Sequence, residues 1–248
     1  MNTLVLFTAN EYVKIFYQTK TKILIALSVL SALTIGIVSF LINNNTGVQM
    51  VAPQRFPMFV LELLTGFVMP VLTIFIGSEL LPSEFKDGTI KNLFALPISK
   101  SIIYIGKIFA GAIEIGIYLL IIGISSVAVS GVINGTEAFG NLGGLFVSYL
   151  GAFAFLVMVL IITSFFTMLI NSPGMAIVMN LFIWFGISVA GIFLTNVKEF
   201  LPTNFVNWYQ PLVNGVNLPM ALPPLMYMLS YCVIFIIAGM MIFERKEV

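Results

Sequence analysis

The chain has 248 residues, of which 60% are hydrophobic and 8% are charged, and its formal net charge is +1. Soluble domains carry about 25% charged residues, so this composition argues against a water-soluble protein and predicts a chain surrounded by lipid. The absence of histidine and the single Cys232 argue against zinc or iron sites and against an internal disulfide. No basic cluster is large enough to indicate a nucleic-acid partner.

Residues 1–20 are predicted to form an amphipathic helix in the cytoplasmic interface. Apolar and aromatic side chains share one face of this helix, while polar side chains recur every four residues on another. The two faces hold Ala9, Tyr12, Val13 and Phe16, and Asn10, Lys14 and Gln18, respectively. The apolar run that follows is too long for a cleaved signal peptide, so we interpret it as the first membrane helix.

Six apolar stretches have the length that a helix needs to cross a bilayer, about 20 residues. They cover residues 23–42, 58–81, 102–132, 142–170, 175–195 and 222–243, with boundaries that are approximate. The third and fourth stretches are longer than one crossing requires, so we expect them to tilt or to extend beyond the bilayer. The whole chain, 1–248, is expected to form a single transmembrane domain.

The placement of lysine and arginine predicts the orientation, because cytoplasmic segments carry an excess of both. With the N-terminus inside, only Arg55 and Lys198 lie on the external side. The cytoplasmic residues are Lys14, Lys20, Lys22, Lys86, Lys91, Lys100, Lys107, Arg245 and Lys246. The expected fold class is therefore an all-α integral membrane protein with six transmembrane helices and both termini in the cytoplasm.

The last external segment, residues 196–221, is expected to be structured rather than a flexible loop. It contains several prolines and the pair Trp208 and Tyr209, which is typical of anchors at the membrane–water interface. We expect short helices or a re-entrant piece at the outer surface.

Residues 82–100, PSEFKDGTIKNLFALPISK, form a charged stretch between the second and third spans. They are predicted to face the cytoplasm and to form a short surface helix over about 84–96. Gly88 is unfavourable inside a helix and indicates a kink or a close backbone contact, and Pro97 ends the element.

Topology alone would explain the lysines of this stretch. It does not explain Leu93 and Phe94, since a short loop gains nothing by exposing a phenylalanine to water. A small apolar patch surrounded by charged residues is typical of a docking surface. We therefore interpret the segment as the contact with another polypeptide.

This stretch resembles the signature of ABC-2 type transporter permeases, which combines E-x-x-x-G-T, an apolar pair, P-x-S and a downstream lysine. The matching residues are Glu84, Gly88, Thr89, Leu93, Leu96, Pro97, Ile98, Ser99 and Lys107. The six spans, the interfacial N-terminal helix and the structured external segment are also similar to that family. Many members have a basic residue directly after the glutamate, where this chain has Phe85.

The resemblance implies that the 84–96 helix is a coupling helix seated in a groove of a separate ATP-binding-cassette ATPase subunit. Polar contacts to that subunit would come from Glu84, Lys86 and Lys91, beside Gly88 and Thr89 of the motif. Leu93 and Phe94 would fill the groove. The chain has no G-x-x-x-x-G-K-[ST] sequence, so ATP and magnesium are expected in the partner and no cofactor, metal or catalytic residue in this chain.

Three acids lie within or near the spans. Glu79 and Glu62 fall near the inner and outer ends of the second span, where Glu62 can meet water or Arg55. Glu114 lies well inside the third span, where an ionisable residue is costly and indicates a function by default. We expect Glu114 to be a pathway or structural acid that is either protonated or paired with a neighbour such as Lys107.

Glu114 also supports an alternative class, a proton- or sodium-coupled secondary transporter. Such proteins often show internal repeats and interrupted helices, which this sequence does not indicate, and the charged stretch would then have no purpose. An intramembrane enzyme is disfavoured, because histidine is absent and no lysine lies deep in a span.

The resemblance favours a permease subunit of an exporter that pairs with a second copy or a related permease in the membrane. Few fixed charges, 23 phenylalanines and 13 methionines suit an amphipathic peptide or another hydrophobic compound, although lipid-facing side chains would explain the same composition. Scarce arginine and abundant asparagine and isoleucine fit an AT-rich bacterium, so the expected location is a bacterial cell membrane.

Overall fold

A computed structural model describes residues 3–46, 51–86, 88–94, 97–170, 172–213, 215 and 217–246. These residues form helices and no strand. The longer helices are α1 (Thr3–Phe16), α2 (Thr19–Thr46), α3 (Phe56–Gly66), α4 (Val68–Glu79), α7 (Lys100–Asn134), α8 (Leu142–Thr167), α9 (Pro173–Phe193) and α11 (Leu218–Arg245). The short ones are η1 (Pro53–Arg55), α5 (Pro82–Lys86), α6 (Ile90–Phe94), η2 (Gly135–Phe139), η3 (Lys198–Phe200), η4 (Pro202–Asn207) and α10 (Gln210–Val213).

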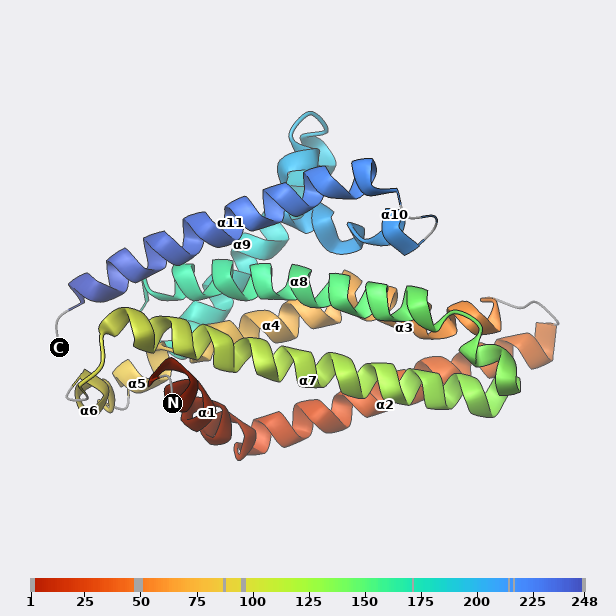
Figure 1. Ribbon diagram of the computed structural model, residues 1–248, viewed down its shortest axis with the longest axis horizontal. Coiled ribbons are helices and arrows are strands. Elements are labelled where there is room, and N and C mark those ends of the chain that lie inside the picture. Colours follow the sequence, from red (N-terminus) through yellow and green to blue (C-terminus); the bar gives the residue numbers. More distant parts are fainter. Residues whose placement is uncertain are drawn as a thin grey trace.

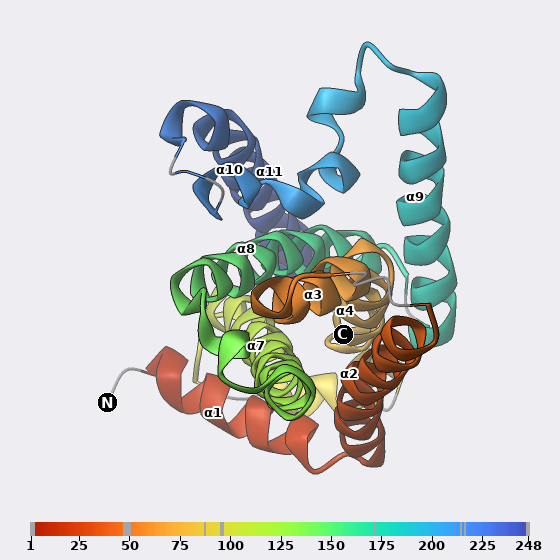
Figure 2. The ribbon, with the colours of Figure 1, turned by 90° about the vertical axis from the view of Figure 1, so that its right-hand side faces the viewer.

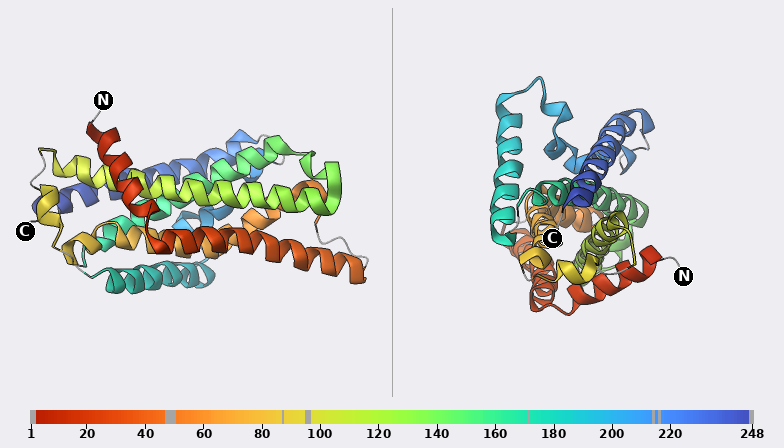
Figure 3. Two further views of the ribbon diagram at one scale, coloured as in Figure 1. Left: turned by 90° about the horizontal axis from the view of Figure 1, so that it is seen from below. Right: turned by 90° about the vertical axis from the view of Figure 1, so that its left-hand side faces the viewer.

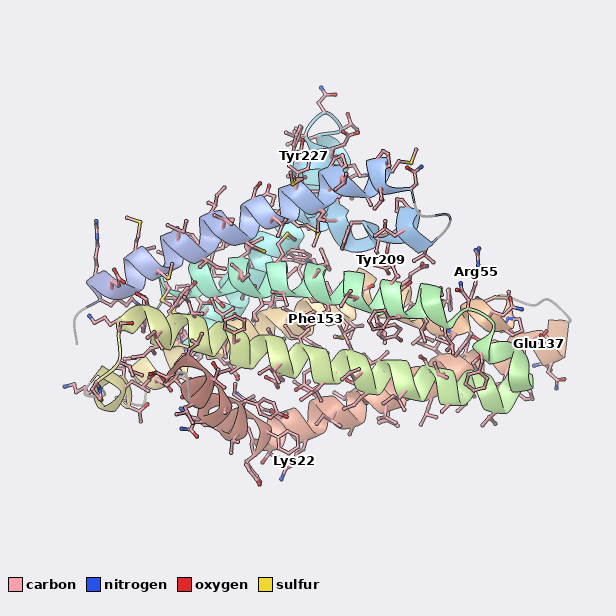
Figure 4. The ribbon with its side chains drawn as sticks, viewed as in Figure 1. Lys22, Arg55, Glu137, Phe153, Tyr209 and Tyr227 are labelled. Carbon is pink, nitrogen blue, oxygen red and sulfur yellow. The ribbon has the colours of Figure 1, made fainter. Side chains whose placement is uncertain are left out.

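Five of the described helices are long and apolar enough to cross a membrane, and α3 with α4 makes a sixth crossing if this bent pair is one span. The prediction of an all-α integral membrane protein is thus confirmed. Both termini lie at the same end of the molecule as α5 and α6 (Figure 1). We call this the inner end, following the predicted orientation, and Figure 4 places Arg55 and Glu137 at the opposite, outer end.

The second predicted span is not one continuous helix. α3 and α4 are bent by 52°, and Phe67 between them has the non-helical angles φ −143° and ψ −55°. Pro70 lies in the first turn of α4, where its missing N–H is tolerated, whereas in a continuous helix its ring would clash with the carbonyl of Gly66. The proline is the local signal for this break.

The core is built around α8, the most buried of the candidate spans. It packs against α4, α7, α9 and α11, and it lies between α7 and α11 in Figure 1. Asn180 of α9 donates hydrogen bonds from its buried amide to Ser78 and Thr167, 3.0 Å each. Polar side chains of this kind hold helices together where lipid removes the hydrophobic driving force.

At one side of the bundle, α9 and α11 diverge from the other helices, and η3, η4 and α10 connect them (Figure 2). The external segment thus contains short helical pieces, as predicted. Trp208 and Tyr209 are not simply interface anchors, because both contact α8. The Trp208 indole donates to the carbonyl of Gly151, 2.9 Å away. Tyr209 is only 1% exposed and occupies the space that a Cβ on Gly151 would need.

The N-terminal helix α1 runs across α7 at the inner end rather than along it (Figure 3). Its buried residues are Phe7, Thr8 and Glu11, while Val13 and Phe16 of the predicted apolar face are exposed. Its position in the membrane interface stays a prediction.

Candidate functional site

The charged stretch forms two single-turn helices, α5 and α6, instead of the one helix predicted over 84–96. The cause is Gly88, whose φ of +68° belongs to the left-handed region that glycine adopts without penalty and that ends a right-handed helix. The prediction of a kink at Gly88 was therefore too weak, because the helix ends before Gly88 and a second helix begins at Ile90. Asp87, Ala95 and Leu96 lie outside the described residues.

The predicted docking residues do not share one environment. Gly88, Thr89 and Lys91 are exposed, so they are available to a partner. Leu93 is partly buried and packs against the core of this chain. The side chains of Lys86 and Phe94 lie outside the described part of the structure.

Glu84 does not lie on the outer surface of α5. It is 3% exposed, and its Oε1 atom is 2.8 Å from Nζ of Lys107 in α7 and 2.7 Å from Nζ of Lys14 in α1. Lys107, itself 1% exposed, also contacts Oε2 of Glu11 at 2.6 Å. These four residues form what we call the inner ionic cluster, which joins α1, α5 and α7.

The energetics of the inner ionic cluster follow from its burial. Removing one partner of a buried ion pair leaves an uncompensated charge and costs about 3–5 kcal/mol. The charges therefore fix the relative positions of three helices. Any displacement that separates the paired charges would carry this free-energy cost. Lys20 and Glu79 form a second pair in which the lysine side chain is about half exposed, so water screens it and its contribution is small.

Of the alternatives expected for Glu114, the pair with Lys107 is not formed. Lys107 is engaged by Glu84 and Glu11, which reach it from other helices. Glu114 is 4% exposed and accepts a hydrogen bond from the hydroxyl of Tyr118, one turn later, at 2.5 Å. The hydroxyl of Thr21 in α2 lies 3.2 Å from the same carboxylate oxygen.

The inner ionic cluster and Glu114 border one cavity of about 330 Å³, which α1, α2, α4, α5 and α7 surround. Its polar side includes Gln18 and Lys20 besides these residues, and its apolar side includes Leu24, Leu72 and Phe75. We call it the inner cavity. Sequence reasoning did not identify it, because its residues come from segments that are up to about a hundred positions apart.

The remaining acid, Glu62, lies in α3 and accepts a hydrogen bond from the Gln210 amide at 3.3 Å. The residue therefore meets the structured external segment. In the described part of the chain, no three His, Cys, Asp or Glu side chains are arranged to hold a metal ion.

Comparison with known families places the chain in a family. The family model described as ABC-2 family transporter protein matches residues 10–188, a range that contains the whole inner ionic cluster, α5, α6 and the inner cavity. No match was found among the curated proteins with which the sequence was compared. Because the family match covers well over half of the sequence, the chain belongs to the ABC-2 family of transporter proteins.

Proposed function

We propose that this permease subunit is energised by a separate ATP-binding-cassette ATPase that docks on α5, the turn at Gly88 and α6. The observation that carries the proposal is the contrast between the two sides of this segment. Thr89 and Lys91 are exposed, whereas Glu84 is buried and forms ion pairs with Lys14 and Lys107 of the inner ionic cluster. One side of this segment is accessible to a partner, and the other side is fixed to α1 and α7 by ion pairs. A displacement of the partner can therefore be transmitted to these helices.

Within this proposal, Glu84 acts as a positioning residue rather than as a direct contact of the ATPase. Its carboxylate is buried against Lys107 and Lys14, so it holds α5 against α7 and α1. Movement of the docked ATPase would then displace the inner ends of these helices together. Hydrolysis itself belongs to the partner, since this chain has no P-loop sequence.

The complete transporter is proposed to contain two permeases, either two copies of this chain or this chain and a related one. α2, α9 and α11 bury little of their apolar surface within the chain, so they offer faces to lipid or to a second permease. The proposed activity is export of an amphipathic peptide or another hydrophobic compound across a bacterial cell membrane. Exposed apolar side chains along these helices support a lipid-embedded route.

Co-purification with the ATPase tests the docking surface. The tagged full-length chain is extracted from its native membrane in a mild detergent, and co-purifying proteins are identified by mass spectrometry. We expect a P-loop ATPase in stoichiometric amount, which Lys91→Glu and Phe94→Asp reduce at least about tenfold, because charge reversal or burial of an unpaired acid costs more than about 1.4 kcal/mol.

The matched control is Lys22→Glu, which makes the same charge change at another exposed inner lysine, beside the turn between α1 and α2 (Figure 4). It should leave the ATPase bound. Equal loss in all three variants would indicate a general effect of charge, and normal assembly of both docking variants would refute the docking surface.

A further inference from the structure

The inner cavity carries more negative than positive side chains. Four carboxylates border it, from Glu11, Glu79, Glu84 and Glu114, against the three ammonium groups of Lys14, Lys20 and Lys107. Each lysine forms an ion pair with one or two of the first three acids. Among the described residues, Glu114 accepts hydrogen bonds from two hydroxyl groups and has no cation within 4 Å, and the charge of Lys20 acts on it from a greater distance across the cavity.

Two further acceptors at this cavity lack donors. Oε2 of Glu84 and Oε1 of Gln18 are buried and have no hydrogen-bond partner within the described part of the chain, and both residues border the cavity. Buried acceptors without donors are costly and rare in native structures. Two acceptors thus lack donors, and beside them the Glu114 carboxylate has no cation within 4 Å, so a positively charged donor that entered the cavity would find partners.

The opposite wall is apolar and faces the membrane. It includes Ile23 and Leu24 of α2 and Leu72 and Phe75 of α4, of which Ile23 is 54% and Phe75 40% exposed. Both helices pack against α7, but they form no substantial contact with each other, so the cavity opens between them. A ligand that matches this site needs a donor-rich cationic head and an apolar body.

We propose that the inner cavity binds the ammonium group of an amphipathic amine, with Glu114 as the anionic partner of that group. A primary ammonium offers three N–H donors, so it can also reach the unpaired acceptors of Glu84 and Gln18. The apolar body lies between α2 and α4, and the ring of Phe75 suits a cation or an aromatic group. The volume of the cavity falls within the range of small-molecule sites.

If the protein is the proposed exporter, this site indicates that its substrates are amphipathic amines. That conclusion rests on the proposed function, whereas the binding of an amine does not. A lone proton or sodium ion would neutralise Glu114 but would leave the apolar wall without a role. An anionic amphiphile would be repelled by the carboxylate of Glu114, and the cavity holds four carboxylates against three ammonium groups.

Fluorescence titration of the purified full-length chain in nanodiscs tests the proposal. The probe is dansylcadaverine, an aromatic primary amine, and its N-acetyl derivative is the uncharged control with the same apolar body. We expect the amine to bind about tenfold to a hundredfold more tightly than the acetylated compound, and Glu114→Gln to remove most of this difference, since a hydrogen bond to a charged group has that effect.

Two further variants keep the result interpretable. Glu62→Gln neutralises an acid of the membrane region outside the cavity and should leave the titration unchanged. Leu72→Trp fills the apolar side without changing any charge and should weaken binding of the amine. Gel filtration and thermal unfolding establish that each variant is folded.

Equal binding of the two probes, or amine binding that neither Glu114→Gln nor Leu72→Trp changes, would overturn the proposal. Competition of sodium with the amine is measured in the wild type and in Glu62→Gln. Displacement of the amine by sodium to the same extent in both would also overturn the proposal, in favour of an ion site. No ATPase is present in this experiment, so its failure leaves the docking proposal untouched, and failure of docking leaves the amine site standing.

Discussion

At the inner end of the bundle, three helices meet at buried charges, whereas at the side of the bundle, between its two ends, the segment from η3 to α10 meets α8 and α11 through aromatic rings (Figure 4). Lys107 contacts two carboxylates at the inner end. In the segment from η3 to α10, Phe205 stacks on Tyr227 with ring centroids 6.1 Å apart, and Trp208 donates a hydrogen bond to a carbonyl of α8.

The difference lies in how sharply each contact depends on position. Coulomb energy between desolvated charges is large and changes steeply when a partner is lost. Aromatic pairs contribute about 0.5–1.5 kcal/mol beyond their buried area and tolerate several ring arrangements. The inner end is therefore suited to transmit a displacement as a unit, and the segment from η3 to α10 is suited to adapt when helices move.

Breaking the inner ionic cluster should have the largest effect. Lys107→Met leaves Glu11 without a cation and Glu84 with only the half-exposed Lys14, so we expect the free energy of unfolding to fall by about 3–5 kcal/mol. Unfolding in detergent, followed by circular dichroism, measures the change. Lys20→Met is the control, because its pair with Glu79 is half exposed and should contribute below about 1 kcal/mol. Similar effects of both substitutions would show that the cluster is not desolvated.

A backbone comparison sharpens the contrast between the ends. Gly88 and Gly135 both have a positive φ, +68° and +63°, and a Cβ on either would meet no neighbour. Gly88→Ala and Gly135→Ala should thus each cost about 1–3 kcal/mol of stability, because a side chain strains a backbone with positive φ. Only Gly88→Ala should also weaken co-purification of the ATPase, because it distorts the turn between α5 and α6. Weakening by the outer variant as well would argue against a docking role specific to the inner turn.

Two substitutions in the segment from η3 to α10 should have the smallest effects and should differ from each other. Trp208→Phe removes the hydrogen bond to Gly151, so we expect a loss of about 1 kcal/mol. Tyr209→Phe removes a buried hydroxyl without a hydrogen-bond partner among the described residues, and it should change the stability little or raise it. Thermal unfolding of the two variants side by side checks this order, and a larger loss for Tyr209→Phe would reverse the interpretation.

Alkaline titration adds a second reading of Tyr209. Burial, and then the charge of Glu62, raises the pKa of its hydroxyl in the folded chain. The stability that this neutral tyrosine contributes is present below its unfolded pKa of about 10 and is lost as the pH rises above that value. Tyr209→Phe should therefore lose less stability than the wild type above about pH 10.

Composition and periodicity were sufficient to predict a helical membrane protein, because about 20 apolar residues in a row have few alternatives to a spanning helix. The charged stretch and its motif were sufficient to indicate the family and a segment exposed at the inner end. Pro70 and Gly88 also mark the two helix breaks in the sequence. We expected a continuous span at Pro70 and only a kink at Gly88.

Only the tertiary structure decided which charges meet. Sequence spacing suggested Glu114 for Lys107, two turns away on the same helix, but the folded chain brings Glu84 and Glu11 to that lysine from α5 and α1. It also gathers Gln18, Leu72 and Glu114 around one cavity. The physical reason is that hydrophobicity and helix propensity act along the chain, whereas a buried charge is satisfied by any partner that packing brings within about 4 Å, whatever its distance in sequence.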